Sequence, residues 1–178
     1  FREEYNGIAF VAEPAHNSVL AHIWSPSGAS FRARRLNSER EFLASRDSWS
    51  RPVNFSVGPY GALYVVDYYR RIIEHPEWTS REVYESDAIY HGNDKGRIYR
   101  VVPVSSPPPL PTGINLDDSS AEELVEHLGH PNLWWRRTSQ RLLVDRGGEE
   151  ALVPLRALAE DSMSGLGRLH ALWTLEGL

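Results

Sequence analysis

Residues 7–13 read Gly-Ile-Ala-Phe-Val-Ala-Glu, and residues 61–67 repeat the pattern as Gly-Ala-Leu-Tyr-Val-Val-Asp, 54 positions later. In both copies a glycine precedes two apolar residues, an aromatic residue, a valine, another apolar residue and a carboxylate. A repeat of this size, with turn residues between short strands, is typical of the blades of a β-propeller. We therefore expect residues 1–103 to be mainly β, forming the terminal blades of an incomplete propeller.

Further strand signals surround the repeat. Runs of alternating or β-branched residues, bounded by Gly, Pro and Ser turns, predict strands at residues 18–24, 31–36, 52–57 and 96–102. A polar stretch from about residue 69 to residue 95 precedes the last of these strands and is too long for a hairpin turn. This stretch is either a short helix or a functional loop.

The second half of the chain has a different pattern. Residues 104–119 form a Pro- and Ser-rich linker, because their prolines suit neither a helix nor a central strand. In residues 120–178, Ser120 and Glu123 form a capping box, and Arg136 and Arg168 begin matching motifs 32 residues apart. Matching helical pairs indicate the start of an all-α array of HEAT-like repeats.

The composition limits the chemistry of the chain. None of its 178 residues is cysteine, which excludes disulfides, thiolate metal sites and Cys-x-x-Cys-His haem attachment within it. The net charge of −5 arises in residues 104–178, where 11 acidic residues outnumber 6 basic ones, and this balance disfavours nucleic-acid binding. No apolar run reaches the length of a transmembrane helix. The chain starts without methionine and stops within a helical pattern, so we expect a piece of a longer protein.

Several stretches, in this order, resemble a known family. Residues 10–17 read Phe-Val-Ala-Glu-Pro-Ala-His-Asn, residues 95–103 read Lys-Gly-Arg-Ile-Tyr-Arg-Val-Val-Pro, and between them lie matches at 40–45, 51–54, 58–70 and 73–78. Together they resemble the membrane-bound dehydrogenase domain family of planctomycetes and verrucomicrobia. That family is similar to the soluble PQQ-type glucose and aldose-sugar dehydrogenases, which are six-bladed propellers. Its members commonly continue into HEAT repeats and a c-type cytochrome domain.

The resemblance implies a bacterial, exported quinoprotein that oxidises a sugar or a related alcohol in the periplasm or at the cell surface. PQQ is the candidate cofactor and calcium a candidate ion. Electrons would pass to a c-type cytochrome, whose haem lies in a domain outside this segment. In such chemistry a base removes the hydroxyl proton while hydride moves to the quinone. The alternative is a non-catalytic scaffold that binds a glycan or a protein partner.

The expected site lies where the loops of neighbouring blades meet. In a propeller, the loop after each second strand and the connection between blades emerge on one face, around the channel mouth. The expected catalytic residues are two accessible bases and one orienting carboxylate: His16, His75 and Asp67. The expected cofactor- or substrate-binding residues are two cations and two amides: Arg51, Arg70, Asn54 and Asn17.

Structural roles remain open for several of these residues. Arg51 could brace neighbouring blades instead of binding a carboxylate or a sugar hydroxyl. Asp67 ends a strand, and its counterpart in the repeat is Glu13, so both could cap turns. His75 precedes a proline and also suits a turn. The Gly-Asn-Asp stretch at 92–94 could contribute to a calcium site or be an ordinary turn.

Overall fold

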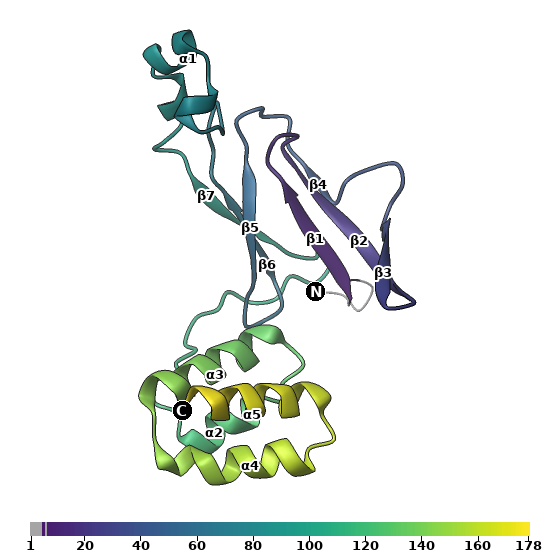
Figure 1. Ribbon diagram of the computed structural model, residues 1–178, viewed down its shortest axis with the longest axis vertical. Coiled ribbons are helices and arrows are strands. Elements are labelled where there is room, and N and C mark those ends of the chain that lie inside the picture. Colours follow the sequence, from purple (N-terminus) through teal and green to yellow (C-terminus); the bar gives the residue numbers. More distant parts are fainter. Residues whose placement is uncertain (1–4, 6) are drawn as a thin grey trace. The chain divides into compact units, whose positions relative to one another are not determined.

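The computed structural model describes residue 5 and residues 7–178. The chain divides into two compact units (Figure 1). The first comprises residues 1–56 and 62–107, and the second comprises residues 57–61 and 108–178. Strands build most of the first unit and helices build most of the second, and each unit has its own apolar core.

The first sheet is organised around one long strand. Its strands are β1 (Ile8–Glu13), β2 (Ser18–Ser27), β3 (Ser30–Arg35) and β4 (Leu43–Ala44). β2 is antiparallel to all three others, with β1 along one edge and β3 and β4 along the opposite edge. Asn17 (φ 56°) and Gly28 (φ 63°) supply the left-handed backbone of the two tight turns that flank β2.

The second sheet has three strands, β5 (Pro52–Val57), β6 (Leu63–Asp67) and β7 (Arg97–Val101), with β6 in the centre. β6 and β7 are antiparallel, and their register places Leu63 opposite Val101 and Asp67 opposite Arg97. A carboxylate and a guanidinium group therefore face each other at the end of the sheet. The strands expected at 52–57 and 96–102 agree with these bounds to within one residue at each end, whereas β2 of the first sheet extends three residues beyond its expected end at residue 24.

Apolar side chains of both sheets form one core in the first unit. Val19 of β2 and Leu63 and Val65 of β6 are at most 4% exposed. Partly buried residues within or next to the strands of both sheets pack against them: Phe10, Phe42, Leu43, Phe55 and Val101. Full burial of one such side chain contributes roughly 1.5–3 kcal/mol, so the two sheets stabilise each other.

Residues 68–96, between β6 and β7, carry short helical segments. These are η2 (Pro76–Trp78), α1 (Arg81–Glu85) and η3 (Ala88–Tyr90), drawn in teal at one end of the first unit in Figure 1. Ser80 caps α1 by accepting a hydrogen bond from the N–H of Val83, and Nδ1 of His75 accepts from the N–H of Glu77 at the start of η2. The predicted short helix is present, and connecting loops make up the rest of this stretch.

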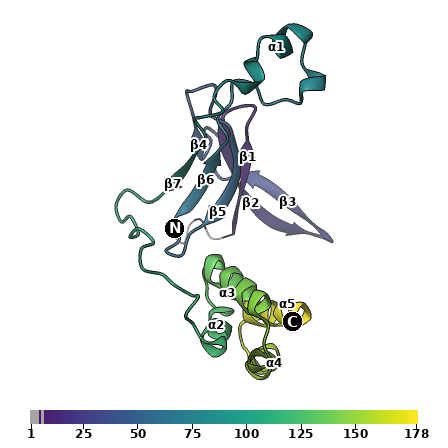
Figure 2. The same ribbon diagram turned by 90° about the vertical axis from the view of Figure 1, so that its left-hand side faces the viewer.

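Helices build the second unit. They are α2 (Ala121–His127), α3 (Leu133–Arg146), η4 (Glu149–Ala151), α4 (Leu152–Asp161) and α5 (Gly165–Gly177). The capping box is confirmed, because Ser120 Oγ accepts from the N–H of Glu123 and the Glu123 carboxylate accepts from the N–H of Ser120. α3 packs on α2 and α5, and α4 packs on α5 and α2 (Figure 2). No helix in the described part of the chain is long and apolar enough to cross a membrane.

The expected propeller is wrong. Residue 5 and residues 7–178 form a mixture of helices and two small antiparallel sheets, and this described part of the chain does not have the architecture of a propeller. The repeat at 7–13 and 61–67 does form two strands, but β1 lies at an edge of its sheet whereas β6 is central. Equivalent strands of successive blades would hold the same place in each sheet. The local pattern therefore predicts strands correctly but not their pairing, which depends on residues distant in the sequence.

The expected all-α class of HEAT-like repeats is also wrong. The two matching arginines have different surroundings: Arg136 is 6% exposed and donates to the carbonyls of His130 and Pro131, whereas Arg168 is exposed and donates to Ala159. Stacked repeats would give both arginines the same contacts. Instead, all four α-helices of this unit share one core, whose fully buried members include Leu124, Leu128, Leu155 and Ala171.

We expect His170, on α5, to make the stability of the helical unit sensitive to acid. Its Nδ1 lies 2.6 Å from Oε1 of Gln140, an arrangement that suits a neutral ring with hydrogen on Nδ1. Burial, together with the charges of Arg136 and Arg137, lowers the pKa of His170 below its usual 6.5. The unfolded chain then binds the proton more readily, so we expect stability to fall as the pH drops below about 6.5 through the lowered value.

Titration of the His170 ring followed by NMR checks this expectation, together with urea unfolding of the protein and its His170→Gln variant at several pH values. The variant should lose the part of the acid sensitivity that His170 contributes. A ring titration midpoint at or above 6.5 would contradict the prediction.

Candidate functional site

A buried carboxylate, Asp67, is the centre of the polar contacts in the first unit. Its side chain is 1% exposed, and Oδ1 accepts from the backbone N–H groups of Arg51 (2.6 Å) and Tyr69 (3.1 Å). Its Oδ2 accepts from the Ser50 hydroxyl (3.1 Å) and from Nε of Arg97 (3.2 Å). These four donors offset the cost of burying the charge. Asp67 thereby links the segment before β5 with the turn after β6.

Arg97 extends these contacts to Tyr69. Its guanidinium carbon lies 4.3 Å from the centre of the Tyr69 ring, a favourable position for a cation on an aromatic face. Burial alone would lower the pKa of Arg97, but the hydrogen bond to Asp67 and electrostatic interactions with Tyr99, Asp67 and Tyr69 outweigh it and raise the pKa. Arg97 therefore stays charged beside Asp67.

Tyr69 adopts a left-handed backbone conformation (φ 49°), which is uncommon for a residue with a bulky side chain. Its hydroxyl is hydrogen-bonded to Asp47, which raises the pKa of Tyr69; the Trp49 N–H and this hydroxyl lower the pKa of Asp47. Gly92 (φ 91°) packs so closely that an added Cβ would lie 3.0 Å from the Tyr69 ring and carbonyl oxygen. Several contacts therefore hold a strained turn between Tyr68 and Arg70.

The guanidinium group of Arg51 donates hydrogen bonds to backbone carbonyls. Its Nε donates to the carbonyl of Arg70 (3.1 Å), Nη1 to that of Pro14 (2.8 Å) and Nη2 to that of Arg71 (2.9 Å). All three nitrogens are therefore engaged within the protein. Arg51 therefore connects the turn after β1 with the residues after β6 through backbone carbonyls, and not neighbouring propeller blades through a carboxylate.

Asn17 belongs to the same group of contacts. Its Nδ2 donates to the carbonyl of Ser48 (3.1 Å) and to that of Ser50 (2.6 Å). Because Ser50 also donates to Asp67, the turn between β1 and β2 is tied to the buried carboxylate through one intermediate residue. The structure thus brings together Asn17, Arg51 and Asp67 as a connected network, which we call the Asp67 network.

A groove of about 810 Å³ lies beside this network, at the residues that follow β6. Its lining combines aliphatic, aromatic, charged and amide side chains: Val53, Tyr68, Arg70, Ile72, Ile73, Glu74, His75, Pro76, Ile89, Tyr90 and Asn93. Two of the aromatic rings are accessible, since Tyr68 is 46% exposed and Tyr90 is 55% exposed. This volume falls within the range of sites for small ligands, roughly 300–1,000 Å³.

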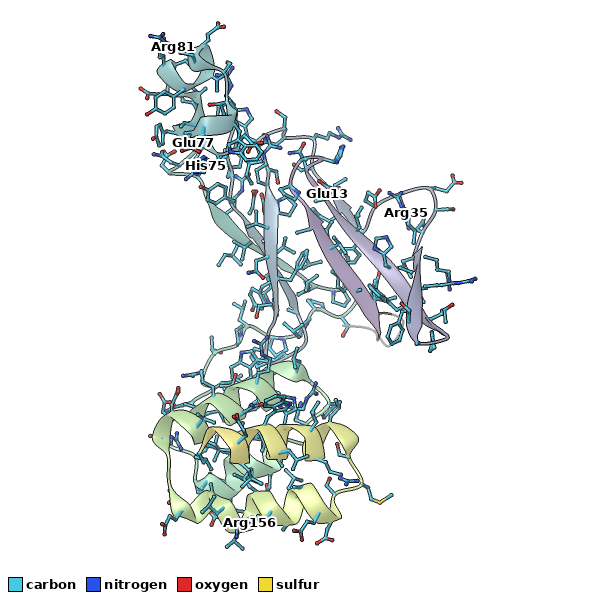
Figure 3. The ribbon with its side chains drawn as sticks, viewed as in Figure 1. Glu13, Arg35, His75, Glu77, Arg81 and Arg156 are labelled. Carbon is cyan, nitrogen blue, oxygen red and sulfur yellow. The ribbon has the colours of Figure 1, made fainter. Side chains whose placement is uncertain are left out.

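Two of the predicted site residues line the groove, Arg70 and His75. The Nη1 group of Arg70 donates to the backbone carbonyls of Tyr69 and Gly92, and its guanidinium carbon lies 4.4 Å from the centre of the Tyr68 ring. His75 occupies the start of η2, where Figure 3 shows it next to Glu77, and its Nδ1 accepts from the Glu77 N–H (3.4 Å). A neutral ring in this arrangement carries its hydrogen on Nε2.

The remaining predicted residues, His16 and Asn54, lie elsewhere. The His16 side chain is 81% exposed, with Nδ1 3.4 Å from the carboxylate of Glu13 at the end of β1 (Figure 3). Oδ1 of Asn54 accepts from the N–H of Phe55 within β5 (2.7 Å). Neither residue lines the groove or joins the Asp67 network.

Sequence reasoning did not single out Tyr90 or Ile89 as part of a site. The available signal was the density of aromatic residues in the stretch 68–90, of which Trp78 and Tyr84 are also exposed. Among the residues that the structure describes, no three His, Asp or Glu side chains gather as metal ligands would.

A second hollow, of about 520 Å³, is lined by residues including Asn37, Arg40 and Glu41. Its polar groups are largely engaged: Glu41 pairs with Arg35 at 2.9 Å, and Oδ1 of Asn37 accepts from the N–H groups of Glu39 and Arg40. The groove beside the Asp67 network is therefore the better candidate site.

Comparison with known proteins shows which family the chain belongs to but does not show an activity. Neither a curated protein nor a solved structure matches the chain. Residues 1–105, which contain the groove and the Asp67 network, match a family described as a domain of unknown function, DUF7133. This match spans more than half of the 178 residues, and the chain therefore belongs to the DUF7133 family.

Proposed function

We propose that this chain binds a sugar or a related polyol in the groove after β6. The observation that carries the proposal is the lining itself, in which the accessible rings of Tyr68 and Tyr90 stand among Arg70, Glu74 and Asn93. Pyranose rings present C–H faces that pack on aromatic rings, and hydroxyls that bond to charged and amide side chains. Both kinds of partner line one groove.

The polar groups of the groove are available for such a ligand. In the described part of the chain, the side chains of Tyr90 and Asn93 make no hydrogen bond, although the backbone N–H of Asn93 donates to the Tyr90 carbonyl (3.1 Å). Only one carboxylate oxygen of Glu74 is engaged, accepting from the N–H of His75 (2.9 Å). A bound polyol would therefore satisfy these groups without displacing internal hydrogen bonds.

Sugar binding is tested by titrating the intact chain with a panel of monosaccharides, using calorimetry or NMR. Tyr90→Ala removes one ring of the groove, and we expect it to weaken binding about twofold to tenfold, because an aromatic contact contributes roughly 0.5–1.5 kcal/mol beyond its buried area. Tyr84→Ala is the matched control, since Tyr84 is similarly exposed (53%) but lies outside the groove. Equal losses in both variants, or no binding to any sugar, would refute the proposal.

Oxidation of the bound sugar by a PQQ-type mechanism is a second proposal, supported by the resemblance of the motifs quoted above and by the presence of Arg70 and His75 in one groove. When bound, the quinone supplies the hydride acceptor. Arg70 fits the binding of such an anionic cofactor, because some of its N–H donors are not engaged within the described residues. Arg51 and Asn17 do not fit, because their donors are hydrogen-bonded to backbone carbonyls.

The hydrogen bonding of His75 favours a role in ligand binding rather than in removing a proton. Its Nδ1 lone pair accepts from the Glu77 N–H, so His75 could take a hydroxyl proton there only by giving up this bond. Reconstitution with PQQ and calcium, followed by a dye-linked assay on the same sugar panel, tests oxidation separately. Electron transfer to a c-type cytochrome and export to the periplasm or cell surface remain proposals from the same resemblance.

A further inference from the structure

We propose that Arg70 is a carboxylate-binding side chain, so that the ligand of the groove is an acidic ring, such as a hexuronate. This inference rests on the proposed sugar-binding function and adds the charge of the ligand. Its basis is that one nitrogen of Arg70 is anchored, while Nε and Nη2 have no hydrogen-bond or ion-pair partner among the residues that the structure describes.

The anchored nitrogen is Nη1. It donates to the backbone carbonyls of Tyr69 (2.9 Å) and Gly92 (2.9 Å) and lies 3.3 Å from that of Tyr68. In contrast, Nε and Nη2 make no hydrogen bond or ion pair in the part of the chain that the structure describes. These two nitrogens lie on one edge of the planar guanidinium group, with parallel N–H bonds, and this edge suits a carboxylate held by two hydrogen bonds.

The position of Arg70 is fixed before any ligand arrives. Its backbone N–H donates to the carbonyl of Trp49 (2.9 Å), and its own carbonyl accepts from Nε of Arg51 (3.1 Å). The residue before it, Tyr69, is held in its left-handed conformation by Asp67 and Asp47. A side chain that is already ordered loses little conformational entropy on binding, which favours affinity.

The charge of Arg70 lacks a counterion in the described part of the chain. No carboxylate lies within ion-pair distance of its guanidinium group among the described residues, whereas Arg35, Arg81, Arg97 and Arg141 each have one. The acidic residue of the groove, Glu74, hydrogen-bonds to the His75 N–H. An anionic ligand would thus meet an unpaired cation beside the Tyr68 ring.

The sharpest test compares matched ligands on the unmodified protein. We expect glucuronate to bind about tenfold or more tightly than its amide, glucuronamide, and than glucose, since hydrogen bonds to a charged group are about twice as strong as neutral ones. PQQ, which also carries carboxylates, is a separate arm of the titration. If PQQ binds in a way that depends on Arg70 and glucuronate does not bind, Arg70 still recognises a carboxylate, but the ligand is a cofactor.

Arg70→Lys tests the residue. Lysine keeps the positive charge and a donor for the backbone carbonyls but lacks the paired N–H edge, so the preference for glucuronate should shrink about tenfold. Arg71→Lys is the matched control, because the side chain of Arg71 does not line the groove.

Two outcomes overturn the inference and separate it from the proposed function. Equal affinity for glucuronate, glucuronamide and glucose would remove the carboxylate site while leaving the sugar-binding groove. Failure of every probe to bind would refute both proposals. Because the ligand comparison uses the unmodified protein, these outcomes hold even where a variant fails to fold.

Discussion

Replacing Asp67 with Asn should lower the free energy of unfolding of the two-sheet unit by about 3 kcal/mol. The new amide nitrogen would replace Oδ2 and face two donors, the Ser50 hydroxyl and Nε of Arg97, which now donate to that oxygen. Arg97 would lose the counterion that is buried beside it. Most of the expected loss comes from donors left without an acceptor beside a buried group, because Arg97 is itself 41% exposed and still lies 3.8 Å from Asp47.

The effect of Asp67→Asn should extend to the groove. Asp67 accepts from the N–H of Tyr69, and the left-handed turn at Tyr69 precedes Arg70, which lines the groove. We therefore expect sugar affinity to fall even at temperatures where the variant remains folded. The measurement pairs urea unfolding followed by tryptophan fluorescence with ligand titration.

Asp94→Asn is the control for this prediction. Asp94 is exposed and makes no hydrogen bond or ion pair in the described residues, so removal of its charge should change stability by less than about 0.5 kcal/mol. Equal stability of the Asp67→Asn and Asp94→Asn variants would show that the Asp67 network does not hold the turn after β6.

Replacing Leu155 with Ala should lower the free energy of unfolding of the helical unit by about 3 kcal/mol, within a range of roughly 2–5 kcal/mol for such changes. Leu155 lies on α4, is 0% exposed and belongs to the core that α2, α3, α4 and α5 share. Truncation removes its buried methyl groups and leaves a cavity that close-packed neighbours fill only in part.

Val153→Ala is the control on the same helix. Val153 is 76% exposed, so its truncation removes little buried area, and alanine is the better helix former. The Val153→Ala protein should be as stable as the unmodified protein or slightly more stable. Urea unfolding followed by circular dichroism at 222 nm checks both variants, and a loss for Leu155→Ala below about 1 kcal/mol would contradict a single helical core.

Parts of this structure could be predicted from local patterns. The strand signals in residues 52–57 and 61–67 predict strands that the structure contains, and Ser120 with Glu123 predicts the start of α2. These features depend on residues two to four positions apart, whose spacing sets which side chains share a face or reach a free N–H group.

The class of the fold could not be predicted in this way. The repeat at 7–13 and 61–67 has the same local pattern in both copies, yet β1 became an edge strand and β6 a central one. Which strands pair is decided by packing across the unit, where Val19 of the first sheet meets Leu63 and Val65 of the second. The propeller expectation failed at this step.

The same distinction applies to the candidate site. The sequence places four polar candidates near predicted loops: Arg51, Asp67, Arg70 and His75. It does not predict which groups they form hydrogen bonds with. Arg51 reaches the carbonyl of Pro14, 37 positions away in the sequence, and this contact uses a donor that a ligand would otherwise bind.

Strands, turns and helix caps can be located from the amino-acid pattern, because they depend on neighbours along the chain. Which polar groups make internal hydrogen bonds, and which remain free, depends on the folded arrangement of distant segments. The reason is that a donor such as Nη1 of Arg51 or Nη1 of Arg70 is satisfied by whichever carbonyl folding brings within reach. The free edge of Arg70, and with it the proposed ligand, follows from that outcome.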